Sequence, residues 1–217
     1  MKKVLIVGAT GVVGNLVLKY CLASTDIDEV RVLGRKSVNN QSPKIKEVLT
    51  DNFKDYTPHH LLFENIDAAF FCIGVYTGQV PKDQFKEITV DYAIKFAETV
   101  KQYSPKATFC LLSGAGADRR ERSRVAFAKF KGMAENQISA LDFDRFYTFR
   151  PGYIYPVTPR KEPNITYKIS RFLYPLIKLF GKNMSIKSTE LAKGMFNVGL
   201  NGAKQEILEN RAILEYS

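Results

Sequence analysis

The chain has 217 residues and a formal net charge of +10, and 45% of its residues are hydrophobic while 25% are charged. This length and balance are ordinary for a soluble globular protein with one domain and a substantial core. No apolar run approaches the roughly 18 residues that a membrane-spanning helix needs, which excludes an integral membrane protein of the helical type.

The excess positive charge lies mostly in residues 119–131 and 160–187. Neither stretch carries a recognised nucleic-acid motif or aromatic stacking platforms, so we expect no nucleic-acid partner. A solvated face, or attraction to a phosphorylated cofactor or a membrane surface, is the simpler explanation. The three cysteines lie far apart, without metal-type spacing, and the two histidines, His59 and His60, are adjacent. These features predict a reduced, cytoplasmic protein without a metal site.

The N-terminal stretch carries the clearest functional signal. An apolar run over residues 3–7 predicts a strand, three glycines follow at intervals of three, and residues 12–23 have the apolar spacing of a helix. Glycines allow a tight turn and close approach of a phosphate, and the amides at the helix N-terminus favour a diphosphate. The sequence therefore predicts a dinucleotide site built by Gly8, Ala9, Thr10, Gly11, Val12, Val13 and Gly14.

A second strand is predicted over residues 30–33, and the residues after it bear on the choice of cofactor. Proteins that prefer NAD place an acid here, on the ribose 2′-hydroxyl, whereas this chain has Gly34, Arg35 and Lys36. Two cations suit a 2′-phosphate, so NADP is preferred and NAD is the less favoured alternative. A solvated basic turn would carry the same residues.

The third and fourth strands, residues 45–49 and 68–74, are predicted to bring further cofactor contacts. Asp51 could reach the adenine amine, and Phe53 could pack nearby. The fourth strand is a continuous apolar run, as buried parallel strands are, and it ends at Cys72, Ile73 and Gly74, beside the expected ribose and diphosphate.

The rest of the first 155 residues continues the alternation. Helices are predicted over residues 85–103 and 119–140, and strands over residues 107–112 and 145–149. Strands and helices that alternate with short links predict an α/β fold with a doubly wound parallel sheet.

Several of these motifs together resemble the atypical short-chain dehydrogenase/reductase superfamily, most of all its oxidoreductase-like group, which includes the Tat-interacting protein of mammals. The motifs are residues 8–14, 34–35, 71–74, 90–92, 111–113, 116–118 and 143–152. The resemblance implies an NAD(P)-binding Rossmann core over residues 1–155, with the nicotinamide near Pro151, Gly152 and Tyr153. It also implies that residues 156–217 form a small C-terminal lid rather than an independent domain.

The superfamily uses a Tyr, a Lys four residues later and a Ser after the fifth strand. A neighbouring lysine makes the phenol a usable acid near neutral pH. Here Phe127 occupies the tyrosine's place before Lys131, and the usual Ser-Ser pair reads Ser113-Gly114. The resemblance implies that Lys131 binds the nicotinamide ribose and that Ser113 holds the substrate oxygen. The tyrosines 76, 153 and 155 are the other candidate acids, although packing would explain each of them.

These observations predict an NAD(P)H-dependent oxidoreductase of unknown small-molecule substrate. An acceptor that needs no proton from the enzyme, such as a flavin or a quinone, would tolerate Phe127. A catalytically silent NADP-binding protein is the alternative, and nucleotide-sugar epimerase chemistry ranks last because it also uses the tyrosine.

The last quarter of the chain predicts two helices and a strand. Residues 166–180 form an amphipathic basic helix, expected to act as a lid or in core packing, with a peripheral membrane or protein contact through residues 165–180 as the alternative. Ser188 is the expected N-cap of a helix that runs to residue 200, and residues 207–214 read as a final strand.

Overall fold

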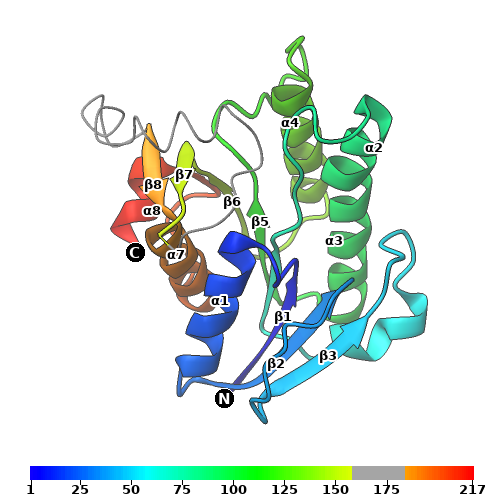
Figure 1. Cartoon of the computed structure of the whole chain (residues 1–217), viewed down its shortest axis with the longest axis vertical. Coiled ribbons are helices and arrows are strands. Elements are labelled where there is room, and N and C mark those ends of the chain that lie inside the picture. Colours follow the sequence, from blue (N-terminus) through cyan, green and yellow to red (C-terminus); the bar gives the residue numbers. More distant parts are fainter. Residues whose placement is uncertain (158–183) are drawn as a thin grey trace.

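A computed structural model of the protein describes residues 1–157 and 184–217, and the helix predicted over residues 166–180 therefore lies outside the described residues. Its centre is a seven-stranded sheet in which every neighbouring pair is parallel, with helices on both faces (Figure 1). The strands are β1 (Lys2–Val7), β2 (Ile27–Gly34), β3 (Ile45–Leu49), β4 (Ala68–Phe71), β5 (Thr108–Leu112), β6 (Phe146–Arg150) and β9 (Ile207–Glu209).

The spatial order of the strands is β3-β2-β1-β4-β5-β6-β9. The chain begins in the middle of the sheet, moves outward to β3, and then crosses back to place β4 against the free side of β1. Ligands of open α/β sheets bind at such a reversal, beyond the carboxyl ends of the two strands. The predicted doubly wound parallel sheet is confirmed, and its switch point lies between β1 and β4.

The sheet separates two hydrophobic cores. On β1, Val4 and Ile6 point to one face while Leu5 and Val7 point to the other, and all four are fully buried. The first face is covered by α1 (Val12–Ala23) and α7 (Ser188–Asn201), and the second by α3 (Tyr92–Tyr103) and α4 (Ala126–Ser139) (Figure 1). Because each face meets apolar side chains, β1 reads as an unbroken hydrophobic run.

Two of the predicted helices differ from the structure. Residues 85–103 are not one helix: α2 (Lys82–Lys86) is followed by a π-helical turn, η2 (Glu87–Asp91), and then by α3. The helix predicted from residue 119 begins at Ala126. The Asp118 carboxylate accepts hydrogen bonds from the amides of Arg120, Arg122 and Ser123 at 2.9–3.1 Å, which holds residues 119–125 in a loop instead of a helical turn.

The C-terminal elements also correct the sequence interpretation. The N-cap of α7 is Lys187, whose amide donates to the Glu190 carboxylate at 3.0 Å, while the Ser188 hydroxyl accepts the amide of Val157. The predicted strand over 207–214 is wrong beyond Glu209, where α8 (Asn210–Glu215) begins. Its partner β6 is followed by a proline, which has no N–H with which to extend the ladder.

The remaining elements are short. They are η1 (Thr57–Phe63), a 3₁₀ segment before β4, and the two-stranded pair of β7 (Tyr153–Tyr155) and β8 (Ser185–Lys187). Among residues 1–157 and 184–217, no helix has the length and apolarity that crossing a membrane requires.

Candidate functional site

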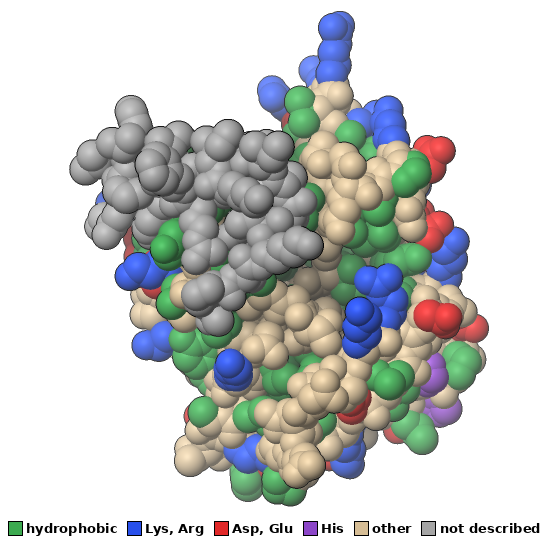
Figure 2. Space-filling model, in the orientation of Figure 1, with side chains coloured by type: hydrophobic (Ala, Val, Ile, Leu, Met, Phe, Trp, Pro, Cys, Tyr) green, Lys and Arg blue, Asp and Glu red, His purple; other side chains and the backbone are tan. Residues whose placement is uncertain are grey.

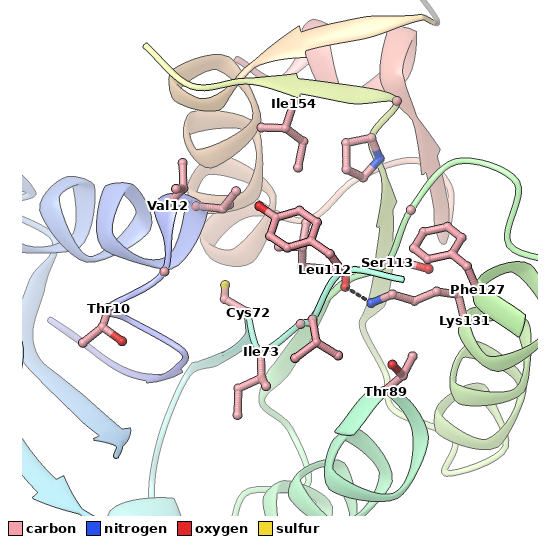
Figure 3. A pocket seen from close by; sticks show the side chains of 18 residues that line it. Thr10, Val12, Cys72, Ile73, Thr89, Leu112, Ser113, Phe127, Lys131 and Ile154 are labelled. Carbon is pink, nitrogen blue, oxygen red and sulfur yellow. Dashed lines mark hydrogen bonds between the residues drawn. The ribbon is translucent and has the colours of Figure 1, made fainter. Parts of the chain in front are cut away.

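A cavity of about 460 Å³ opens at the carboxyl edge of the sheet, at the switch point. Figure 3 shows Thr10 and Val12 on one side, Ser113, Phe127 and Lys131 on the other, and the end of β4 between them. Eleven of the predicted site residues line it: Thr10, Gly11, Val12, Val13, Cys72, Ile73, Gly74, Ser113, Lys131, Pro151 and Gly152. Tertiary folding thus gathers motifs that are 140 residues apart in the chain.

The turn between β1 and α1 requires glycine at two points. Gly8 has φ of +83°, and a Cβ there would lie 2.7 Å from the carbonyl carbon of Cys72. A Cβ on Gly14 would lie 2.3 Å from the Gly8 oxygen, so the helix packs directly on the turn. Gly8 and Gly14, with the buried Ala9, shape this turn without lining the cavity.

The N-terminus of α1 is free to receive an anion. Gly11 is its N-cap and provides no side-chain hydrogen bond, and its first turn contains no acidic residue. The orphan amides of the first turn and the helix dipole favour negative charge at this point. The cradle therefore fits the diphosphate of a nicotinamide dinucleotide.

Lys131 is the cation of the cavity. Its side chain comes from α4, is 8% exposed, and donates to the carbonyl of Leu112 at 2.9 Å (Figure 3). Burial lowers the pKa of Lys131 to about 8, although the charges of Glu135 and Cys72 act in the opposite direction. An ammonium has three donors, so two remain for a ligand or water in the cavity.

Phe127 lies one helical turn before Lys131 and also lines the cavity. A Cβ added to Gly114 would lie 2.4 Å from its para carbon Cζ, and 3.1 and 3.5 Å from the two adjacent ring carbons. The ring therefore presents its para carbon end-on to Gly114. The ring carries no hydroxyl, so Phe127 has no proton to offer at the position where the resemblance implies a tyrosine.

The Ser113 side chain is buried, and its hydroxyl is already engaged in a hydrogen bond. Its hydroxyl donates to the Glu135 carboxylate at 2.5 Å. Burial by itself raises the pKa of Glu135, but hydrogen bonds from Arg150, Ser113 and Arg119 hold it below its usual value. Since that carboxylate is ionised and can only accept, Ser113 must be the donor in this bond.

Glu135 is a residue that the sequence interpretation missed. Its side chain has no exposed surface, and it also accepts from Thr148 at 3.0 Å, Arg150 at 2.5 Å and Arg119 at 2.9 Å. The available signal was its position, four residues after Lys131, which places both on one face of α4. The carboxylate links the floor of the cavity to β6.

Besides Gly8, Ala9 and Gly14, five predicted cofactor residues do not line the cavity. Arg35 and Lys36 are exposed after β2 and have no ion-pair partner within the described part of the chain. Asp51 is exposed as well. Phe53 is 5% exposed and packs on Tyr92 with ring centroids 5.5 Å apart. The last of the five, Tyr153, belongs to β7 and is not among the lining residues. Of the three tyrosines considered as candidate acids, Tyr76 does line the cavity.

Basic side chains are spread over the face shown in Figure 2, with acidic and hydrophobic side chains between them. The three cysteines are buried and free, and no cluster of three metal-ligating side chains occurs among the described residues.

Comparison with known proteins finds relatives and solved structures that agree with the resemblance indicated by the sequence motifs. No family model matches the chain. The rat protein HTATIP2 is 28% identical over 217 residues, which covers 98% of this chain and 88% of the rat protein. The mitochondrial protein FMP52 of Debaryomyces hansenii is 31% identical over 150 residues, and the match spans only 64% of that protein's length.

Solved structures share the fold at low identity. Gre2 of Candida albicans, in complex with NADPH, superposes with a TM-score of 0.72 at 15% identity, over 97% of this chain and 78% of that one. The enzyme WbmF of Bordetella bronchiseptica, in complex with NAD⁺, gives 0.69 at 14% identity, over 99% and 76%. These structures confirm the Rossmann fold, and the match to HTATIP2 over nearly the whole chain confirms the resemblance that the motifs indicate.

Proposed function

We propose that this chain is an NAD(P)H-dependent oxidoreductase whose cofactor lies across the switch point between β1 and β4. The observation that carries the proposal is the cradle of Gly8 and Gly14, which brings the uncapped N-terminus of α1 to a cavity that also contains Lys131. The solved NADPH complex of Gre2 and the NAD⁺ complex of WbmF, which share the fold, support a nicotinamide cofactor.

Within this proposal each part of the site has a role. The amides of residues 11–14 hold the diphosphate, and the two free donors of Lys131 hold the nicotinamide ribose. When bound, the reduced nicotinamide supplies a hydride. The ends of β4 and β6 and the apolar residues Ile73 and Ile154 exclude water from the place where that hydride would move.

Two finer points belong to the proposal. Arg35 and Lys36 favour NADP over NAD, because exposed cations after β2 can reach a 2′-phosphate. A cytoplasmic location is supported by three reduced, buried cysteines, and cell fractionation tests it, since the fungal relatives are named mitochondrial.

The test compares Val12→Asp with Val12→Asn by thermal shift and calorimetry with NADPH and NADH. Val12 is the first residue of α1 and lines the cavity. A carboxylate there favours the helix electrostatically but repels a diphosphate, whereas the amide has nearly the same size and no charge. We expect the wild type and Val12→Asn to bind NADPH, and Val12→Asp to lose at least about tenfold in affinity while remaining folded.

Equal binding by the two variants would show that the dinucleotide does not lie at this helix terminus. Absence of any stabilisation of the wild type by NADPH or NADH would refute the proposed function itself. A ligand present at 100 times its Kd should add about 2.7 kcal/mol to the free energy of unfolding.

A further inference from the structure

We propose that the electron acceptor is a planar, conjugated dicarbonyl of the quinone type, or a flavin that shares its chemistry, rather than an isolated aldehyde or ketone. This inference rests on the proposed function, because it requires a reduced nicotinamide in the same cavity. It follows from three positions of the cavity, residues 113, 114 and 127, that offer no neutral hydrogen-bond donor to a substrate oxygen.

Three positions that could donate to a substrate oxygen do not. Phe127 offers a ring carbon at the place of the superfamily's phenol, and Gly114 offers no side chain at the place of the second serine. The hydroxyl of Ser113 donates its hydrogen bond to the Glu135 carboxylate, at 2.5 Å, so it can only accept a hydrogen bond from a group in the cavity. A carbonyl oxygen that gains negative charge would therefore meet no neutral donor from these residues.

The two classes of acceptor differ in how much they need such a donor. Hydride addition to an isolated carbonyl produces an alkoxide, a strong base whose conjugate acid is about as weak an acid as water. Hydride transfer to a quinone produces a hydroquinone monoanion, which is a phenolate with a conjugate-acid pKa near 10. The second product is roughly a millionfold less basic and can leave the site before it is protonated.

The electron balance of the step is complete. One hydride, with its two electrons, passes from the dihydronicotinamide to the quinone, so that the nicotinamide becomes the oxidised cation and the quinone becomes the hydroquinone monoanion. The monoanion then takes one proton from water. No side chain of the protein changes its protonation or oxidation state.

The rest of the cavity suits a flat anion. The ammonium of Lys131, whose donors hold the nicotinamide ribose and the carbonyl of Leu112, lies beside Phe127, and its positive charge stabilises delocalised negative charge without a direct hydrogen bond. Phe127, Val75 and Ile154 provide apolar contact for a ring. Three other hydroxyls line the cavity and come from different elements: Thr10 from the turn before α1, Thr89 from η2 and Tyr76 from the loop after β4.

The experiment measures NADPH oxidation by the full chain with 2-methyl-1,4-naphthoquinone, with FMN and with an aliphatic and an aromatic aldehyde, each against a protein-free blank. We expect kcat/KM for the quinone or the flavin to exceed that for either aldehyde by at least about 100-fold. The ratio of kcat/KM for the naphthoquinone to kcat/KM for FMN shows whether the site prefers a quinone or a flavin as acceptor. Since the hydroquinone monoanion takes its proton from water only after the hydride has moved, we expect a solvent isotope effect near 1.

A binding measurement gives a second readout that does not depend on turnover. Calorimetry with the naphthoquinone and NADP⁺-loaded protein should show saturable binding, weakened at least about fivefold by Phe127→Ala. The matched control is Leu61→Ala, which removes an exposed hydrophobic side chain of η1 that does not line the cavity.

Several results would overturn the inference while leaving NADPH binding, and so the proposed site, intact. These are aldehyde reduction as fast as quinone reduction, oxidation of NADPH by none of the acceptors, and a solvent isotope effect of about 2 or more that Tyr76→Phe removes. The last result would assign a proton to the phenol of Tyr76. Failure of NADPH to bind would instead refute the proposed function.

Discussion

The para carbon of Phe127 faces Gly114 so closely that a methyl group added to the glycine would lie 2.4 Å from it. These are the two positions at which the resemblance implies a departure from the superfamily's catalytic pattern. Their contact makes the departures a single packing arrangement: the ring occupies the space above residue 114, and residue 114 has no side chain that would resist it.

We expect Gly114→Ala to lower the free energy of unfolding by about 1–3 kcal/mol, because its Cβ overlaps the Phe127 ring, which itself packs in an apolar cluster with Phe85 and Phe130. In a Phe127→Ala background the same change should cost much less. Urea denaturation of the two single variants and the double variant gives the coupling. Additive effects would show that the contact is unimportant.

Restoring the superfamily's residue by Phe127→Tyr should not restore carbonyl reduction. The added hydroxyl extends the ring toward the backbone of Gly114, so the ring has to move, and we expect a loss of about 1–3 kcal/mol in stability. Urea denaturation and an aldehyde assay with NADPH measure both effects. Unchanged stability together with new aldehyde reduction would contradict the prediction.

Arg35→Ala should weaken NADPH binding at least about tenfold and leave NADH binding within about twofold, because only NADPH carries the 2′-phosphate. Calorimetry with the two cofactors measures the ratio. Lys106→Ala is the matched control: it removes one exposed cation at the opposite edge of the sheet, before β5. The same loss of affinity for both cofactors would place Arg35 away from the 2′-phosphate.

Glu135→Gln should lower the free energy of unfolding by about 3 kcal/mol at neutral pH, since it leaves Arg119 and Arg150 without their buried countercharge. The folded state holds the pKa of Glu135 below its ordinary 4.5, so the stabilisation is present above that pH and is lost as the pH falls through the lowered value. The difference from wild type should therefore shrink in acid.

The control for Glu135→Gln is Glu98→Gln, which breaks an exposed pair with Lys95 on α3 and should change stability by less than about 0.5 kcal/mol. Urea denaturation at pH 7 and in the acid range checks both variants. A loss for Glu135→Gln that equals the control's, or that does not diminish in acid, would show that the carboxylate does not stabilise the fold.

Lys131→Met should stabilise the folded protein by about 1–3 kcal/mol at pH 7 while weakening NADPH binding. Burial lowers the pKa of Lys131 from 10.5 to about 8, so the unfolded chain binds more protons between these values and wild-type stability rises with pH across that window. The advantage of the variant should therefore shrink between pH 8 and 10.5.

Lys129→Met, on the exposed face of the same helix, should show no such pH dependence. Urea denaturation at pH 7 and pH 10 compares the two lysines, and calorimetry gives the cofactor affinity. A Lys131→Met variant that is less stable than wild type at pH 7 would mean that the hydrogen bond to Leu112 outweighs the cost of burying the ammonium.

The sequence alone determined the sheet and the cofactor side of the cavity. Buried parallel strands such as β1 and β4 must be continuously apolar, and a turn that brings backbone against backbone must use glycine, as at Gly8 and Gly14. Both constraints act within a few consecutive residues, so they can be recognised in the sequence. The start of α4 could not be predicted in this way, because the hydrogen bonds that the Asp118 carboxylate accepts from the following amides hold those residues in a loop.

Only the tertiary structure shows how the side chains are arranged on the side of the cavity where we propose that the acceptor binds. That Ser113 gives its proton to Glu135, and that Phe127 points at Gly114, depends on how β5 and α4 are brought together from opposite ends of a 13-residue connection. Such contacts leave no periodic trace in the sequence, because they depend on distances across the fold. Spacing along the chain could place a serine, a phenylalanine and a lysine near one another, but only their packing shows which of them still has a proton to offer.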